Sequence, residues 1–183
     1  MEIIKYSNIG CREINQDCLA SLSFDHDKSI HIVADGIGGY DCGEIASKIV
    51  CESYIHGLVN NLSIDEVTKE VSKNIQTECR NLGVSKMGST VAAVVLNGLQ
   101  ASIFWAGDSR VYVFRDKHLL YQTEDHSLLN ELSRIRELSF DEKKRYKHII
   151  TRSIMGNADD KVDHDNLELC FGDEILICTD GMY

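Results

Sequence analysis

Residues 90–96 (TVAAVVL) are apolar at nearly every position, and no other segment narrows the choice of fold as much. Asn97-Gly98 follows, a pair that favours a two-residue hairpin turn, and the return segment 101–106 is again largely apolar. An antiparallel strand with no polar face has to be covered on both sides. The pattern therefore predicts two sheets packed face to face, with helices outside them.

Two long helices are expected before this hairpin. Apolar residues recur near helical spacing over 42–59, and Asp41 can cap the N-terminus of that segment. Ser63 and Glu66 have the spacing of a capping box ahead of a second amphipathic segment, which Gly83 can end in a left-handed conformation.

The remaining elements complete a layered fold. Strands are expected at 29–34, 110–115 and 174–178, and helices at 127–138 and 141–147. No internal repeat or linker-like stretch divides the chain, so residues 1–183 are predicted to form a single domain. We expect an α+β fold, a four-layer α-β-β-α sandwich of two antiparallel sheets flanked by helices.

Charge and composition exclude several classes of function. The chain has 19 Lys and Arg against 29 Asp and Glu, a formal net charge of -10, which repels nucleic acid and an anionic membrane surface. No apolar run reaches the roughly 18 residues of a membrane span, and the N-terminus lacks an export signal, so we expect a cytoplasmic protein. The seven cysteines form an odd set without a C-x-x-C pair and are expected to be reduced thiols.

Three of the apolar strands run directly into an aspartate beside a glycine or a serine. These are Asp35 before Gly36, Asp108 before Ser109 and Asp180 before Gly181. Any one of them could simply begin an Asx turn. A carboxylate at the end of a buried strand is costly to desolvate unless a cation or a donor meets it, so three together indicate one shared cation site.

Aspartate oxygens are hard ligands that suit Mg²⁺ or Mn²⁺, and a glycine beside Asp35 lets a backbone carbonyl approach the ion. Two such ions sharing a carboxylate can activate water for attack on phosphorus, which predicts a phosphoester hydrolase. The substrate phosphate would also need a cationic partner, and Arg12, five residues before Asp17, is the candidate.

At this point the chain resembles the metal-dependent protein phosphatase 2C family of serine/threonine phosphatases, in its compact bacterial form. The matching segments, in the family's order, are R-E-I-N-Q-D at 12–17, V-A-D-G-I-G-G at 33–39, M-G-S-T at 87–90, W-A-G-D-S-R-V-Y at 105–112, T-E-D-H-S-L at 123–128, I-T-R-S-I-M-G at 150–156 and G-D-E-I-L-I-C-T-D-G at 172–181. They span nearly the whole chain, and the family's β-sandwich flanked by helices agrees with the layers expected above.

The resemblance implies two Mn²⁺ or Mg²⁺ ions with a third, weaker site. Asp35 would bridge the first two ions, the Gly36 carbonyl would bind one of them, and Asp180 would complete the first site. Asp17 would reach a metal-bound water. Asp108 and Asp180 would form the third site seen in bacterial members.

The catalytic set implied by the resemblance is Arg12, Asp35 and Asp180, with Arg12 holding the substrate phosphate. Ser89 and Thr90 would support the metal shell rather than take part in the chemistry. The helical insert at 127–155 would correspond to the family's flap near the active site.

The function implied is a cytoplasmic phosphatase that removes phosphate from serine or threonine of proteins phosphorylated by a Ser/Thr kinase. The family continues beyond the T-D-G segment through a helix to a final Asp-Asn strand, whereas this chain stops at Tyr183. We therefore expect a domain that lacks its C-terminal helix and last strand, monomeric but able to associate through an exposed sheet edge. The alternative is a non-catalytic module that binds phosphorylated partners.

Two other patterns have structural interpretations. The acidic residues between Asp159 and Asp165 lack the glycine and glutamate of a calcium-binding loop and are expected to lie in an exposed loop. His126, in the T-E-D-H-S segment, is interpreted as a hydrogen-bonded structural residue rather than a catalytic one.

Overall fold

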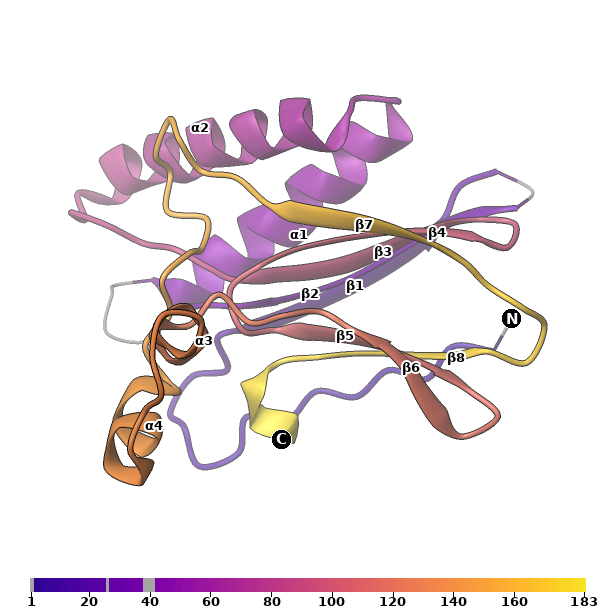
Figure 1. Ribbon diagram of the computed structural model, residues 1–183. Helices are drawn as coiled ribbons and strands as arrows, with labels where there is room; N and C mark the ends of the chain where they lie inside the picture. Colours follow the sequence, from indigo (N-terminus) through magenta and orange to yellow (C-terminus); the bar gives the residue numbers. More distant parts are fainter. Residues whose placement is uncertain (1, 26, 38–41) are drawn as a thin grey trace.

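The computed structural model describes residues 2–25, 27–37 and 42–183, which form two antiparallel sheets packed against each other (Figure 1). The five-stranded sheet has the order β1 (Asp17–Ser23), β2 (Lys28–Asp35), β3 (Val91–Asn97), β4 (Gln100–Ala106) and β7 (Asp163–Glu168). The three-stranded sheet has the order β6 (His118–Gln122), β5 (Arg110–Arg115) and β8 (Glu174–Cys178). The predicted pair of antiparallel sheets is confirmed.

Strand β3 lies at the centre of the five-stranded sheet and is buried on both faces, as its apolar sequence predicts. Val91 and Ala93 face the core beneath the helices, whereas Ala92 and Val94 face the core between the two sheets. The predicted hairpin at Asn97-Gly98 joins β3 to β4. The alternation along one strand thus supplies both hydrophobic cores.

Helices α1 (Gly43–Val59) and α2 (Ile64–Leu82) cover the outer face of the five-stranded sheet (Figure 1). The capping box of Ser63 and Glu66 forms as predicted, and Gly83 ends α2 in the left-handed conformation. The predicted cap Asp41 lies outside the described residues. Glycine at position 57 lets the two helices approach closely, because a Cβ there would lie 2.4 Å from Cγ2 of Val67.

The outer face of the three-stranded sheet carries no helix in the described part of the chain. The sequence analysis expected helices on both sides of the sandwich, in a domain that lacks its C-terminal helix. Strand β8 is an edge strand of this sheet. No helix within residues 2–25, 27–37 and 42–183 has the length and apolar character needed to cross a membrane.

Three strands were missed by the sequence analysis, namely β1, β6 and β7. β1 was not predicted, and the expected exposed acidic loop is wrong from Asp163 onward, because Asp163–Glu168 forms strand β7. Polar residues occupy nearly all of β7, so no alternation marks it. Its backbone pairs with the edge of β4, and its polar side chains remain at the surface, which an edge strand permits.

The helical insert contains α3 (Leu128–Ser133) and α4 (Phe140–Tyr146). The predicted helix at 127–138 is too long, because the helical conformation ends at Arg134. Ser139 caps the N-terminus of α4 in an extended conformation, and Arg136 binds the Glu142 carboxylate across the turn at 2.6 Å. These two interactions favour a turn over continuation of α3.

The close approach of α1 and α2 generates a stability prediction. Gly57→Ala should lower the free energy of unfolding by about 1–3 kcal/mol, because the new methyl group overlaps the fully buried Val67. Val67→Ala alone should also destabilise the protein, through the space it leaves. The double variant should lose clearly less than the sum of the two losses in urea unfolding. Additive losses would contradict this packing.

Candidate active site

Strand register brings the first two candidate carboxylates together. Asp17, the first residue of β1, is the direct antiparallel partner of Asp35, the last residue of β2. Directly opposed residues of antiparallel strands project from the same face of the sheet. Two aspartates about 20 residues apart in sequence therefore lie side by side at one end of the five-stranded sheet.

The other two carboxylates reach this end from the second sheet. Arg110 at the start of β5 pairs with Cys178 at the end of β8, and Asp108 and Asp180 each lie two residues beyond this pair, close enough for the charge of Asp180 to raise the pKa of Asp108. Asp180 begins a short 3₁₀ turn at 180–182. The Thr179 hydroxyl donates a hydrogen bond to Oδ2 of Asp17 at 3.2 Å. The site therefore lies where the ends of the two sheets meet.

The backbone of Asp35 is held by residues of the M-G-S-T segment. Its N–H donates to Oγ1 of Thr90 at 2.9 Å, and its carbonyl accepts from Oγ of Ser89 at 2.9 Å and from the N–H of Thr90 at 2.9 Å. Gly36 packs so closely on Gly43 that a Cβ at position 36 would lie 2.2 Å from the Gly43 carbonyl oxygen. These contacts fix the end of β2, and with it the position of the backbone from which the Asp35 carboxylate projects.

The electrostatics of the site are those of crowded carboxylates. Burial, followed by the charges of Asp17, Asp180 and Asp108, raises the pKa of Asp35 to about 7. Burial and the charge of Asp180 raise the pKa of Asp108 to about 6. Burial also raises the pKa of Asp17, although the hydrogen bond from Thr179 opposes the shift. The four aspartates therefore repel one another through space.

Arg12 is the one cation among the sequence-predicted site residues. It precedes β1 in an exposed segment, and its charge lowers the pKa of Asp17 and of Asp35 against the larger effect of burial. This effect on both carboxylates is consistent with a guanidinium near the site, as expected from the sequence. An anion at the mouth of the site would meet this positive charge.

The donor chemistry of the site fits hard divalent cations. Carboxylate oxygens and a backbone carbonyl are the ligands that Mg²⁺ and Mn²⁺ prefer, and a cation would relieve the mutual repulsion of the aspartates. Within the described ranges, no three His, Cys, Asp or Glu side chains already enclose an ion-sized space. Side-chain rotation toward a bound ion would have to complete the coordination. The assignment of Asp17, Asp35, Gly36, Asp108 and Asp180 as ligands thus stays a prediction.

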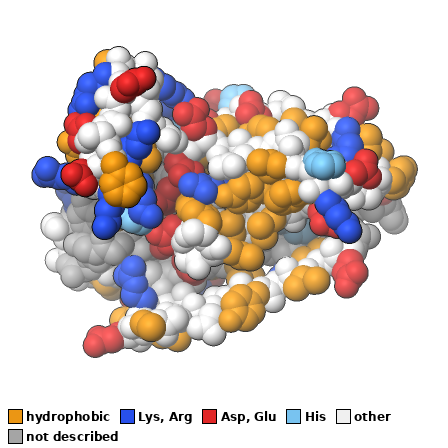
Figure 2. Space-filling model, turned by 60° about the horizontal axis from the view of Figure 1, so that its bottom comes forward, with side chains coloured by type: hydrophobic (Ala, Val, Ile, Leu, Met, Phe, Trp, Pro, Cys, Tyr) orange, Lys and Arg blue, Asp and Glu red, His pale blue; other side chains and the backbone are white. Residues whose placement is uncertain are grey.

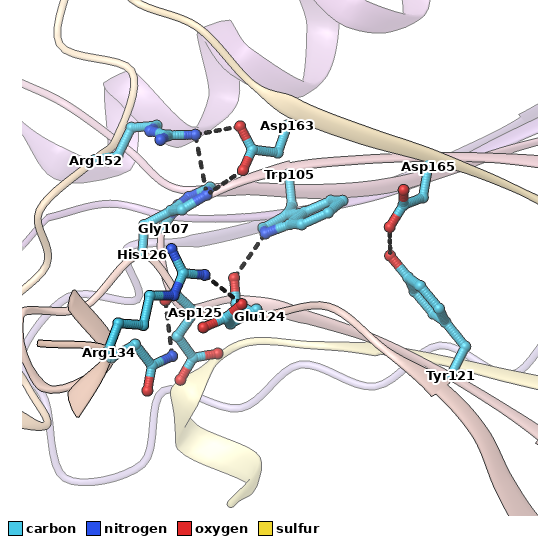
Figure 3. A network of polar contacts seen from close by, with 11 residues as sticks. Trp105, Gly107, Tyr121, Glu124, Asp125, His126, Arg134, Arg152, Asp163 and Asp165 are labelled. Carbon is cyan, nitrogen blue, oxygen red and sulfur yellow. Dashed lines mark hydrogen bonds and ion pairs between the residues drawn. The ribbon is translucent and has the colours of Figure 1, made fainter.

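His126 ties the loop that carries Asp108 to neighbouring elements (Figure 3). Its Nδ1 accepts a hydrogen bond from the N–H of Gly107 at 3.1 Å, so the ring proton belongs on Nε2, which lies 3.1 Å from Oδ2 of Asp163. The imidazole stacks on Trp105 with 6.0 Å between ring centroids. Burial, with a contribution from the Arg152 charge, lowers the pKa of His126 and favours the neutral form. The structural role predicted for His126 agrees with these contacts.

A second polar cluster borders Asp108 and was not found from the sequence. Arg110 binds Asp125 through two hydrogen bonds of 2.7 and 2.6 Å. The Arg110 guanidinium also lies 3.5 Å from the centroid of the Tyr183 ring, and the Tyr183 hydroxyl donates to the Asp108 carbonyl. Only the position of Arg110 and Asp125 within the matched W-A-G-D-S-R and T-E-D-H segments could have suggested this pairing.

Figure 2 shows acidic side chains gathered in a hollow of the molecular surface, beside a projecting lobe that is rich in basic side chains. The lobe contains α3 and α4, which stand next to the end of the sheets in Figure 1. The helical insert therefore flanks the end of the sheets at which the candidate site lies.

Comparison with known proteins agrees with this arrangement. A serine/threonine phosphatase of Listeria monocytogenes is 29% identical over 189 residues, covering 93% of this chain and 73% of the relative. The protein phosphatase PhpP of Streptococcus pneumoniae is 29% identical and covers 100% of this chain and 79% of its own.

Among solved structures, the catalytic domain of the serine/threonine protein phosphatase PstP in complex with two manganese ions superposes with a TM-score of 0.76 at 26% identity, covering 93% of this chain and 73% of that one. The family model described as protein phosphatase 2C matches residues 6–183. With its two antiparallel sheets, its strand-end aspartates and this match over nearly its full length, the chain belongs to the protein phosphatase 2C family.

Proposed function

We propose that this protein is a metal-dependent serine/threonine protein phosphatase that uses Mn²⁺ or Mg²⁺. The observation that carries the proposal is that Asp35 has three further aspartates within electrostatic reach, its partner at the start of β1 and two beside the ends of β5 and β8. The family membership supports the same reaction class. Substrates would be phosphoserine and phosphothreonine in proteins modified by a kinase.

Some residues of this chain would bind the ions, and Arg12 would orient the substrate. Asp35 would hold both ions, with the Gly36 carbonyl and Asp180 on one of them, and Asp108 with Asp180 would hold a third, weaker ion. When bound, the ions would supply Lewis-acid polarisation and a lowered pKa for water. Arg12 would bind two oxygens of the phosphoryl group through its planar guanidinium.

Orientation of Asp35 and Asp108 depends on groups that do not touch the substrate. The hydroxyl of Thr90 holds the N–H of Asp35 and also bonds Oγ of Ser109 at 2.7 Å, next to Asp108. His126 holds the N–H of Gly107 on the other side of Asp108. These bonds connect both carboxylates to the rigid centre of the fold, which supports a positioning role for Thr90 and His126.

A non-catalytic module that binds phosphorylated proteins is the second candidate. It is favoured by the observation that, as placed in the described residues, no three His, Cys, Asp or Glu side chains have the arrangement that would hold a metal ion. Arg12 could still attract a phosphate without turnover. The two candidates make opposite predictions for hydrolysis.

Replacement of the Asp35 carboxylate distinguishes the phosphatase from the binding module. With Mn²⁺ present, the wild-type chain should hydrolyse p-nitrophenyl phosphate, and Asp35→Asn should reduce kcat/KM by at least about 100-fold, because a charged ligand is lost. The same substitution should weaken Mn²⁺ binding in calorimetric titration. The exposed Asp159→Asn is the matched control and should change neither quantity. Phosphopeptide binding without wild-type turnover would instead establish the binding module.

The positioning role of His126 can be tested by two substitutions. His126→Ala leaves the buried Gly107 N–H without an acceptor and should lower the free energy of unfolding by about 1–3 kcal/mol, with kcat falling more than KM rises. In His126→Asn the side-chain oxygen can replace Nδ1 as the acceptor and should restore part of kcat. Equal kcat values for the two variants would exclude positioning through this bond, and urea unfolding would report the structural loss separately.

A further inference from the structure

The helical insert has the opposite charge to the rest of the protein. Residues 127–155 contain seven Lys and Arg against four Asp and Glu, a net charge of +3, so the remaining chain carries -13. In Figure 2 the basic side chains stand out on the lobe next to the acidic hollow. A positive element placed beside a strongly negative site needs a physical reason, since the site itself repels anionic molecules.

Some of these cations have partners within the chain. Arg134 binds Glu124 at 2.5 Å, Arg136 binds Glu142 at 2.6 Å, and Arg152 binds Asp163. The pairs with Glu124 and Asp163 fix the insert against the body of the protein, whereas the pair with Glu142 lies within the insert, and all three neutralise part of its charge. They leave a separate group of cations on α4.

The second half of α4 and the residue after it carry four exposed cations in five positions, which we call the α4 cluster: Lys143, Lys144, Arg145 and Lys147. None of the four forms an ion pair with a carboxylate of the described residues. Cations near a helix C-terminus are favoured by the helix dipole, but that effect decays within the last turn and does not require four of them. Like charges three and four residues apart also repel one another, so the cluster is open to an external anion.

Exposed apolar side chains lie in the same lobe. Ile135, in the turn between α3 and α4, and Phe140, the first residue of α4, are each 79% exposed. Large apolar side chains beside unpaired cations are typical of surfaces that bind polypeptides, where the apolar groups anchor and the charges select. A purely electrostatic surface for a polyanion would not require them.

The insert is attached directly beside the candidate active site. The N–H of Leu128 donates to the carbonyl of Ile149 at 2.8 Å, which closes the base of the insert. The N–H of His126 donates to the carbonyl of Gly107 at 2.9 Å, one residue before Asp108. A polypeptide with its phosphate at the aspartates can therefore extend across α4.

We propose that the α4 cluster, with Ile135 and Phe140, is a docking surface for an acidic segment of the phosphorylated protein substrate. The proposal rests on the proposed function and specifies its substrate class: phosphoserine or phosphothreonine in a sequence that carries several Asp or Glu residues. Charge complementarity supports this occupant, because the four cations of the α4 cluster form no ion pair within the described residues and the chain outside the insert is strongly acidic. The acidic body would also disfavour a nucleic acid as the occupant.

The test compares two phosphopeptides that differ only in charge. One carries acidic residues beside its phosphoserine, and the other carries the corresponding amides. Wild-type kcat/KM should be roughly tenfold higher for the acidic peptide, mainly through KM, because several surface attractions of modest size add up. The preference should shrink as NaCl is raised from about 50 mM to about 500 mM, since exposed charges are screened.

Charge reversal then tests whether the α4 cluster causes the preference for the acidic peptide. The variant K143E/K144E/R145E/K147E should lose the preference for the acidic peptide. The matched control reverses four exposed cations on α1 and α2, as K48E/K69E/K73E/R80E, which changes the net charge equally and should keep the preference. A preference that survives in the α4 variant, or that falls equally in the control, would overturn the proposal. Circular dichroism of each variant verifies that it is folded.

Two further measurements separate this proposal from its rivals. Turnover of p-nitrophenyl phosphate by the wild-type chain tests the proposed function alone, so equal rates on the two peptides with intact turnover of the small ester would reject only the docking surface. Fluorescence anisotropy should show tighter binding of the labelled acidic peptide than of a single-stranded oligonucleotide of equal charge. Tighter binding of the oligonucleotide would overturn the proposal in favour of a nucleic-acid surface.

Discussion

The arrangement of the site depends on the register of two pairs of antiparallel strands. Asp17 lies opposite Asp35 in the first sheet, and the pairing of β5 with β8 sets the neighbouring strand ends beside which Asp108 and Asp180 lie. A slip of one residue between β1 and β2 would turn one carboxylate to the opposite face of its sheet. The register is fixed by burial, because the same strands place apolar side chains in the two cores, and so the packing of the cores determines where the charges meet.

Carboxylates in this arrangement work against folding. Their mutual repulsion and their burial raise the pKa of Asp35, which means that the charged form of that side chain is destabilised in the folded protein. The fold tolerates this because the surrounding backbone is held independently of the charges. Thr90 and Ser89 bind both sides of the Asp35 peptide, and Gly36 packs against Gly43 where no side chain would fit. A functional site that destabilises its own scaffold is expected where charge has to be concentrated before a ligand arrives.

Local signals in the sequence account for much of the fold. The hairpin at Asn97-Gly98 and the capping box at Ser63 depend on neighbouring residues, so they could be predicted. Strand β7 could not, because its polar sequence becomes a strand only through pairing with β4. The candidate site shows the same difference between local signals and tertiary contacts. The strand-end motifs pointed to Asp35, Asp108 and Asp180, whereas the pairing of Arg110 with Asp125 depends on tertiary contacts. The roles of the carboxylates as metal ligands remain predictions.

The distribution of charge links the site to its surroundings. A strongly acidic body concentrates cations at the aspartates, yet the same field opposes the approach of a phosphorylated, anionic substrate. Arg12 only weakens this repulsion, because its effect on the pKa of Asp17 and of Asp35 is smaller than those of burial and of the Asp180 charge. The helical insert carries a net charge of +3, and two of its cations bind carboxylates outside it while the α4 cluster stays exposed. The separation of negative charge on the sheets from positive charge on the insert would thus allow the proposed metal site and the proposed docking surface to lie at adjacent positions of one acidic chain.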